Sequence, residues 1–227
     1  MDHAELYSAI KRGTNYIPGP IKRKTEESPK AVVKPSFPCI VIAVSTGGPQ
    51  TLNKVFQQIN PSIDAAVMVA QHGPDWSLEN MVKRFEQDYK FSVELAGHGE
   101  MLKPNHVYVA PGNLHLQVNP DSLETELSDG PPVNFLRPAA DPLFKTAAKA
   151  FGKNCLAVVL TGLGEDGSMG AKYVKEQGGT VIVQDPNTAV APFMPRACID
   201  RCKEVKIVSL DEMGMQIKRS LPTKKKY

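Results

Sequence analysis

The sequence predicts an α/β protein with a doubly wound, mainly parallel β-sheet and an antiparallel hairpin insertion. Several near-continuous apolar runs have the length of a strand, which is typical of parallel strands buried on both faces. Segments with helical spacing separate these runs, whereas the middle of the chain is rich in turn residues. A chain of 227 residues is long enough to cover such a sheet on both faces.

The first half of the chain alternates between strand and helix. The apolar run at 39–44 (CIVIAV) predicts a strand, and the glycines and Pro49 that follow predict a turn into a helix ending near Ile59. The run at 65–71 (AAVMVAQ) predicts a second strand, before a helix at about 77–88. A helix after each strand is the arrangement expected of a parallel sheet.

Four short segments between residues 91 and 136 predict antiparallel hairpins rather than βαβ units: FSVEL, HVYVAPG, LHLQVNPD and LETELSDGPP. Alternation of helix and strand then returns. The predicted elements are a helix with apolar residues at 143, 144, 147, 148 and 151, a strand CLAVVLTG from Cys155, a helix at 168–177, a strand TVIVQ at 180–184 and a last helix with Leu210, Met213 and Ile217 on one face.

The two ends of the chain differ in composition from its centre. Residues 14–38 contain five prolines among Lys, Glu and Ser, so we interpret 1–38 as an N-terminal arm and flexible linker, 39–221 as the folded domain and 222–227 as a basic tail. Seven Lys/Arg and four Asp/Glu in 1–36, with five Lys/Arg and no acid in 217–227, leave a net charge of −5 for 37–216. An acidic centre argues against nucleic-acid binding.

Composition also indicates the cytoplasm. No apolar run approaches the roughly 20 residues that span a bilayer, which argues against membrane insertion, and the N-terminus has no apolar core of a secretion signal. The four cysteines form no CxxC pair, and we expect Cys39 and Cys155 to be buried, reduced thiols. Cys198 and Cys202 are one helical turn apart, but no His follows at ligand spacing, so no metal and no cofactor is expected.

Ligands of open α/β sheets bind beyond the carboxyl ends of the strands, so reactive residues are expected there. Ser45 follows the first strand in the sequence Ser-Thr-Gly-Gly-Pro, a sharp turn into a helix. The glycines allow close approach of the backbone, and helix-start N–H groups can stabilise an anion. The alternatives are an ordinary turn with Ser45 as helix cap, or a phosphate-binding loop, although neither a Walker A nor a GxGxxG pattern is present.

His72 and Asp166 also follow predicted strands. His72 is the one histidine that ends a buried-looking strand, before a Gly-Pro turn, and Asp166 follows the strand from Cys155 and leads into a helix. The alternative for Asp166 is a helix-capping carboxylate. Because the three residues can converge at one sheet edge, we predict the catalytic triad Ser45, His72 and Asp166 of a serine hydrolase.

Six stretches, in order over about 38–210, resemble the catalytic domain of the CheB-type chemotaxis protein-glutamate methylesterases: IAVSTGGPQTL, VAQHGP, HVYVAPGNLHL, RPAADPLFKTAA, VVLTGLGEDGSMGA and GGTVIVQDPNTAVAPFMPRACID. The resemblance implies Ser45 as nucleophile, His72 as general base and Asp166 as orienting carboxylate. It further implies an oxyanion and substrate site at Thr46, Gly47 and the backbone around Leu163. The chain departs from the family's usual residues at Gly73, Leu136 and Phe193, where we expect the walls of the site.

The resemblance also implies a function. Members of the family remove methyl groups from glutamyl methyl esters of bacterial chemoreceptors, releasing methanol, and many also deamidate receptor glutamines, without a cofactor. The expected partners are the cytoplasmic domains of methylated chemoreceptors. The alternative is a non-catalytic chemosensory scaffold of the same fold.

Regulation in this family usually depends on an attached receiver domain of about 100 residues or more. The 38 residues before the first strand are too few to form one. We therefore expect a domain that is either constitutively open or controlled by a separate receiver protein, or else a fragment of a longer chain.

Overall fold

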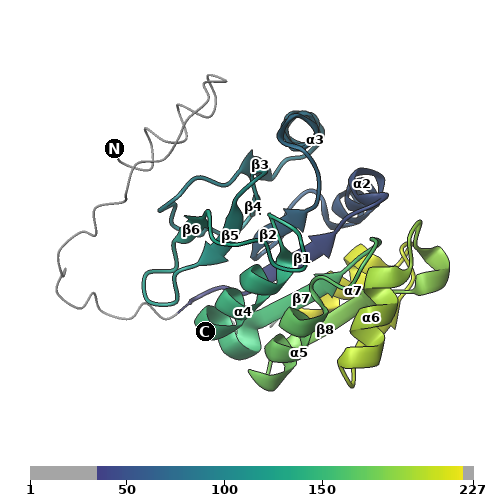
Figure 1. Ribbon diagram of the computed structural model, residues 1–227. Coiled ribbons are helices and arrows are strands. Elements are labelled where there is room, and N and C mark those ends of the chain that lie inside the picture. The colour runs from purple at the N-terminus through teal and green to yellow at the C-terminus, as the bar shows by residue number, and fades with distance from the viewer. Residues whose placement is uncertain (1–34, 222–227) are drawn as a thin grey trace, which may run out of the picture.

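The computed structural model describes residues 35–221, so most of the predicted N-terminal arm and all of the predicted basic tail lie outside the described residues. The described chain forms three layers, with helices on both faces of a central sheet (Figure 1). This confirms the predicted fold class.

Seven parallel strands form the central sheet in the order β3-β4-β2-β1-β7-β8-β9. Their bounds are β1 Cys39–Val44, β2 Ala66–Gln71, β3 Ser92–Leu95, β4 His106–Val109, β7 Cys155–Val159, β8 Thr180–Gln184 and β9 Lys206–Val208. The strand order runs in one direction from β1 to β2 and in the other from β7 to β9. The switch point, where ligands bind in such sheets, therefore lies at the carboxyl ends of β1 and β7.

Within residues 35–221, three helices cover each face of the sheet. Helices α2 (Gly48–Ile59), α3 (Asp75–Asp88) and α7 (Met213–Ser220) contribute to one apolar cluster. Helices α4 (Ala140–Phe151), α5 (Ser168–Glu176) and α6 (Phe193–Arg201) contribute to the other. All six residues of β1 are buried, because alternate side chains enter the two clusters.

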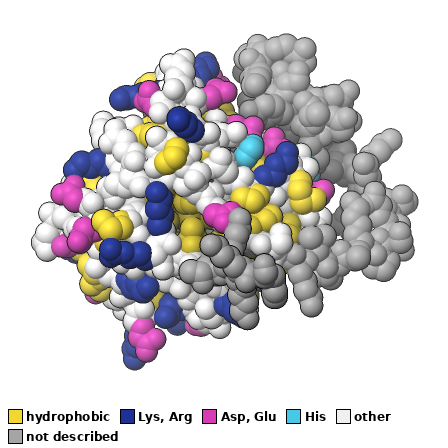
Figure 2. Space-filling model, turned by 180° about the vertical axis from the view of Figure 1, so that it is seen from behind, with side chains coloured by type: hydrophobic (Ala, Val, Ile, Leu, Met, Phe, Trp, Pro, Cys, Tyr) yellow, Lys and Arg dark blue, Asp and Glu magenta, His cyan; other side chains and the backbone are white. Residues whose placement is uncertain are grey.

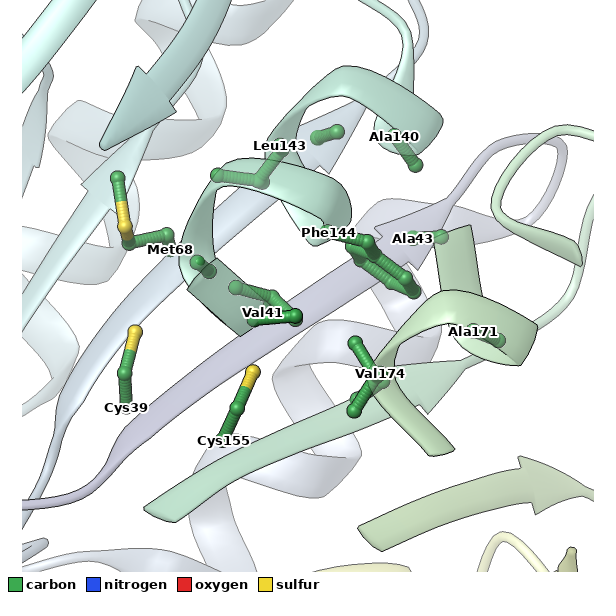
Figure 3. Packing of buried hydrophobic residues seen from close by; sticks show 14 of the residues in the cluster. Cys39, Val41, Ala43, Met68, Ala140, Leu143, Phe144, Cys155, Ala171 and Val174 are labelled. Atoms are coloured by element: carbon green, nitrogen blue, oxygen red, sulfur yellow. The ribbon is translucent and has the colours of Figure 1, made fainter. Parts of the chain in front are cut away.

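The second cluster is centred on helix α4, whose Leu143 and Phe144 pack toward β1 and β2 (Figure 3). The thiols of Cys39 and Cys155 lie on neighbouring strands in the same cluster, and all four cysteines are free and buried, as predicted for Cys39 and Cys155. Burial raises the pKa of Cys155 to about 12 and that of Cys39 well above its usual value. These thiols therefore stay protonated and unreactive at neutral pH.

The prediction for the middle of the chain was wrong in part. Only β5 (His115–Val118) and β6 (Thr125–Ser128) form an antiparallel hairpin, whereas β3 and β4 are parallel strands of the main sheet. The connection between β3 and β4 contains no helix, and it is held by the hairpin instead. The N–H of Gly99 donates to the carbonyl of Thr125 at 2.8 Å, and that of Leu102 donates to Leu123 at 3.0 Å. This long-range pairing gives no local sequence signal.

Replacing Gly170 with Ala should destabilise the fold. In an open helix, Ala is favoured over Gly by about 1 kcal/mol. At Gly170, however, a Cβ would lie 2.5 Å from the Phe144 Cβ and 3.2 Å from the Asp141 backbone, because α4 and α5 approach closely there. Such overpacking costs roughly 1–3 kcal/mol, so urea denaturation should show a lower free energy of unfolding.

Gly73→Ala is the matched control, since the nearest atom to its added Cβ would be the Leu78 Cδ2 at 3.7 Å. We expect this variant to unfold like the wild type. Equal or greater stability of Gly170→Ala would contradict the close helix approach.

Candidate active site

Ser45 lies directly beyond strand β1, at the switch point of the sheet. Its N–H donates to the carbonyl of Thr161 at 2.9 Å, which ties it to the segment after β7. A Cβ at Gly162 would lie 2.8 Å from the Ser45 Cβ, so only glycine permits this approach. The N-cap of helix α2 is Gly47, with φ of 78° and no side-chain cap. Ser45 is therefore not the helix cap that the sequence left open.

His72 lies beside Ser45 across the sheet. Val44 and Gln71 are register partners at the ends of β1 and β2, and the His72 N–H donates to the Val44 carbonyl at 3.1 Å. Ser45 and His72 are thus the next residues on two adjacent parallel strands, which are about 4.8 Å apart in any sheet. The side chain of His72 is 8% exposed.

Asp166 meets His72 from the other side of the switch point. Its Oδ2 lies 2.8 Å from the His72 Nε2, and its side chain is fully buried. Asp166 also accepts from the N–H groups of Ala140 at 2.6 Å and Asp141 at 3.2 Å, the first residues of helix α4. The carboxylate therefore caps α4 rather than α5, whose N-cap is Gly167. The capping role that the sequence left open for Asp166 is therefore found at α4 and not at the helix that follows it.

The hydrogen bonds keep Asp166 ionised. Burial acts to raise the pKa of Asp166, but the hydrogen bond from His72 and those from Ala140 and Asp141 outweigh it, so the pKa lies below its usual value. An ionised carboxylate accepts hydrogen bonds only, so the His72 Nε2 carries the proton in this pair. The Nδ1 of the neutral ring is then the free acceptor, as a general base requires.

Gln71 links the two strand ends that carry Ser45 and His72. Its Nε2 donates to the Ser45 carbonyl at 3.2 Å and to the His72 carbonyl at 2.7 Å. A Cβ at Gly48 would lie 1.8 Å from the Gln71 Oε1, so the first helical residue of α2 must be glycine for the Gln71 side chain to make these two hydrogen bonds. Gln71 was not predicted as a site residue, although a polar residue that ends a buried apolar strand is a visible signal.

Thr161 and Gln184 hold the segment after β7 in the same way. The Thr161 hydroxyl donates to the Thr46 carbonyl at 2.9 Å and accepts from the Ala191 N–H at 2.9 Å. The Thr161 N–H donates to the Gln184 Oε1 at 2.9 Å. Both side chains are buried, Gln184 at the end of β8 and Thr161 beyond the end of β7, and they join three loops around Ser45. They too were missed by the sequence analysis.

The predicted oxyanion residues are near Ser45 in the chain or across the switch point. Thr46 is exposed and Gly47 half-buried, and both precede the first turn of α2. Leu163, 55% exposed, lies two residues after Thr161. The positive end of the α2 dipole lies beside Ser45, which is a suitable place for a developing negative charge.

The other described histidines have different environments. His115 is buried, with its Nε2 3.1 Å from the Pro131 carbonyl and its Nδ1 accepting from the Ala139 N–H at 3.2 Å. His106 stacks on Tyr108 and lies 3.9 Å from Glu94, and the His98 Nδ1 accepts from the Leu127 N–H. These contacts agree with a structural role for them.

The described residues add three observations. Basic and acidic side chains are interspersed over the face seen in Figure 2, rather than gathered into one basic patch. Within residues 35–221, no cluster of three or more His, Cys, Asp or Glu side chains is arranged to hold a metal ion. In the same range, no helix combines the length and apolarity needed to cross a membrane.

A parallel sheet with a serine, a histidine and a buried carboxylate at its switch point is typical of α/β serine hydrolases. A family model described as CheB methylesterase matches residues 40–217, and the chain belongs to this family. The predicted resemblance is thereby confirmed.

Two relatives are named protein-glutamate methylesterase/protein-glutamine glutaminase. One, from a Nocardioides species, is 39% identical over 184 residues, covering 80% of this chain and 50% of the relative. The other, from Pyrococcus abyssi, is 35% identical over 194 residues, covering 83% and 53%. The chain thus spans about half the length of these relatives.

The crystal structure of the Thermotoga maritima CheB methylesterase catalytic domain has a similar fold. It superposes with a TM-score of 0.76 at 31% identity, covering 81% of this chain and 98% of that domain.

Proposed function

We propose that this chain is a protein-glutamate methylesterase, which hydrolyses glutamyl methyl esters of chemoreceptors and releases methanol. The observation that carries the proposal is the 2.8 Å contact between His72 and the buried Asp166, beside Ser45 at the switch point. Family membership and the names of the relatives support the reaction and the substrate. A scaffold without activity would not require this arrangement of charge and hydrogen bonds.

The proposed reaction proceeds in two steps. The His72 Nδ1 takes the proton of the Ser45 hydroxyl, whose oxygen attacks the ester carbonyl, and the same proton then leaves with methanol. Water, deprotonated by His72, next attacks the acyl carbonyl. The bond to the Ser45 oxygen breaks, His72 returns the proton to that oxygen, and the glutamate is freed. Asp166 fixes the ring and stabilises its positive charge in both steps. The N–H groups of Thr46, Gly47 and Leu163 are proposed to receive the oxyanion.

The same site suits glutamine deamidation, in which ammonia leaves instead of methanol.

Exposed apolar side chains lie near this edge of the sheet, at Trp76 after β2, Leu163 after β7 and Phe193 at the start of α6. Such side chains are suited to a protein substrate, and we propose that they receive the methylated cytoplasmic domain of a chemoreceptor. The proposed compartment is accordingly the cytoplasm, and a separate receiver protein remains the proposed regulator.

Methanol release from membranes carrying methylated chemoreceptors tests the proposal. The wild-type chain should release methanol in proportion to the loss of receptor methylation, and membranes with unmethylated receptors should give none. Equal release with and without the added chain would overturn the proposed function.

Chelation should leave the rate unchanged. The proposed base is a histidine and the proposed nucleophile a serine, so no step needs a bound metal. We expect methanol release in excess EDTA to match the rate in buffer. A rate that collapses in EDTA and recovers with zinc would indicate a metallohydrolase instead.

A further inference from the structure

A short turn brings the side chain of Asn134 to the buried carboxylates of Asp166 and Asp141. The N–H of Val133 donates to the Leu136 carbonyl at 3.0 Å, and the N–H of Leu136 donates back to Val133 at 2.9 Å. The two residues between them, Asn134 and Phe135, have φ of 53° and 63°. Left-handed backbone at both central positions is typical of a type I′ turn, where Asn is favoured and Phe is strained.

Arg137 anchors this turn to the loop before it. Its guanidinium donates to the carbonyl of Asp129 at 2.6 Å and to that of Gly130 at 3.0 Å. The side chain of Phe135 is fully exposed at the tip. Asn134 is itself exposed on this surface turn, and its amide reaches inward from there.

The Asn134 amide lies between two buried carboxylates. Its Nδ2 donates to the Asp141 Oδ2 at 3.0 Å and to the Asp166 Oδ1 at 3.4 Å. An amide nitrogen carries two hydrogens, so it can serve both oxygens at once. The other Asp141 oxygen accepts from the Gly170 N–H at the start of α5. Asp166 and Asp141 thus cap α4 and α5 in turn, and Asn134 joins them.

The charges around the pair explain why a neutral donor is needed here. Burial and the nearby charge of Asp166 raise the pKa of Asp141. The hydrogen bond from the Gly170 N–H opposes them only in part. Lys145 on α4 and the amide of Asn134 act in the opposite direction. His72 faces Asp166, and the neutral thiol of Cys198 on α6 lies near Asp141. A donor between the two carboxylates therefore reduces the repulsion between them.

We propose that Asn134 is a positioning residue, whose amide fixes the plane of the Asp166 carboxylate toward His72. The inference rests on the proposed function only in giving Asp166 the orienting role. The remaining donors to Asp166 are the two rigid N–H groups of α4 and His72 itself. The Oδ1 accepts from the Asp141 N–H at 3.2 Å, and Asn134 adds a side-chain donor to the same oxygen from the surface turn at 3.4 Å. This second donor opposes rotation of the carboxylate about the Cβ–Cγ bond.

Asn134→Gly removes the amide, and glycine tolerates the left-handed backbone. Asn105→Gly is the matched control, because Asn105 also has a positive φ of 62° and its side chain accepts from the Ile63 N–H at 3.1 Å. Asn105 precedes β4, at the opposite edge of the sheet from Ser45. Any general cost of replacing a left-handed Asn appears in both variants.

The first readout is kinetic. A hydrogen bond to a charged group is worth roughly tenfold, so kcat of Asn134→Gly should fall about five- to tenfold with KM within about twofold. Asn105→Gly should leave both kcat and KM unchanged. An unchanged kcat in Asn134→Gly would overturn the proposal.

The second readout is independent of activity. The His72 Nε2 proton, held by an ionised carboxylate, should give a far-downfield NMR signal that shifts or broadens in Asn134→Gly but not in Asn105→Gly. Asn134→Asp, which sets a third carboxylate against the pair, should change the signal further. An identical signal in wild type and both Asn134 variants would overturn the positioning role, even if the wild-type chain released no methanol and the proposed function failed.

Discussion

Replacing Ser45 with Ala should reduce methanol release by about 10⁶-fold, the usual cost of losing the nucleophile of a triad. The substitution keeps the Cβ that packs against Gly162 and removes only a hydroxyl at the end of β1. The backbone contacts of Ser45 with Thr161 and Gln71 do not involve that hydroxyl and should persist. Circular dichroism and the melting temperature should therefore match the wild type.

Ser92→Ala, on the exposed side of edge strand β3, is a suitable control and should retain full activity. Release by Ser45→Ala above a tenth of the wild-type rate, with the fold intact, would show that Ser45 is not the nucleophile. Since such a result leaves His72 and Asp166 in place, it would point to water attack assisted by the histidine alone.

Much of the fold could be predicted because buried parallel strands have a strong local pattern. CIVIAV is apolar throughout, and all six residues enter the core. The hairpin of β5 and β6 and the parallel pair β3 and β4 look alike in sequence, since both are short and bounded by turns. They differ in the strands with which they pair, and the hydrophobic periodicity of a segment does not reveal its partner strand.

The position of the candidate site could be predicted for a topological reason. The carboxyl ends of parallel strands share one edge, so residues that follow β1, β2 and β7 must come together even though 94 residues separate His72 from Asp166. Asn134 follows no strand of the main sheet and reaches Asp166 through a type I′ turn. Its contribution depends on backbone dihedrals and on a partner 32 residues away, neither of which the sequence displays.

Three residues differ from the usual family pattern, and their effect on substrate recognition remains a prediction. Gly73 is exposed directly after His72, Leu136 closes the turn that carries Asn134, and Phe193 is exposed at the start of α6. None of them contacts the Asp166 carboxylate through a described hydrogen bond, so we expect them to affect the choice of substrate rather than the chemical step.

Asp166→Asn should lower kcat by about 10⁴-fold, as in other serine triads. In the part of the chain that the structure describes, the four groups that reach the Asp166 carboxylate are all donors: the His72 ring, the N–H groups of Ala140 and Asp141, and the Asn134 amide. An Asn side chain has one oxygen, which accepts, and one NH₂ group, which donates. On one side of the residue the NH₂ must therefore face groups that are themselves donors. If the NH₂ faces His72, the ring takes the other tautomer and its Nδ1 no longer accepts a proton.

The same geometry predicts a loss of stability, because a buried donor is left without an acceptor at the start of α4, at a cost of roughly 1–3 kcal/mol. Asp185→Asn is the matched control. Asp185 caps the short 3₁₀ helix Pro186–Thr188 through the Asn187 N–H at 2.9 Å, and Asn is an equally good cap at such a position. This control should change neither the melting temperature nor kcat. If Asp166 had only a capping role, Asp166→Asn would lose stability while kcat, measured well below the melting temperature, stayed within threefold of wild type.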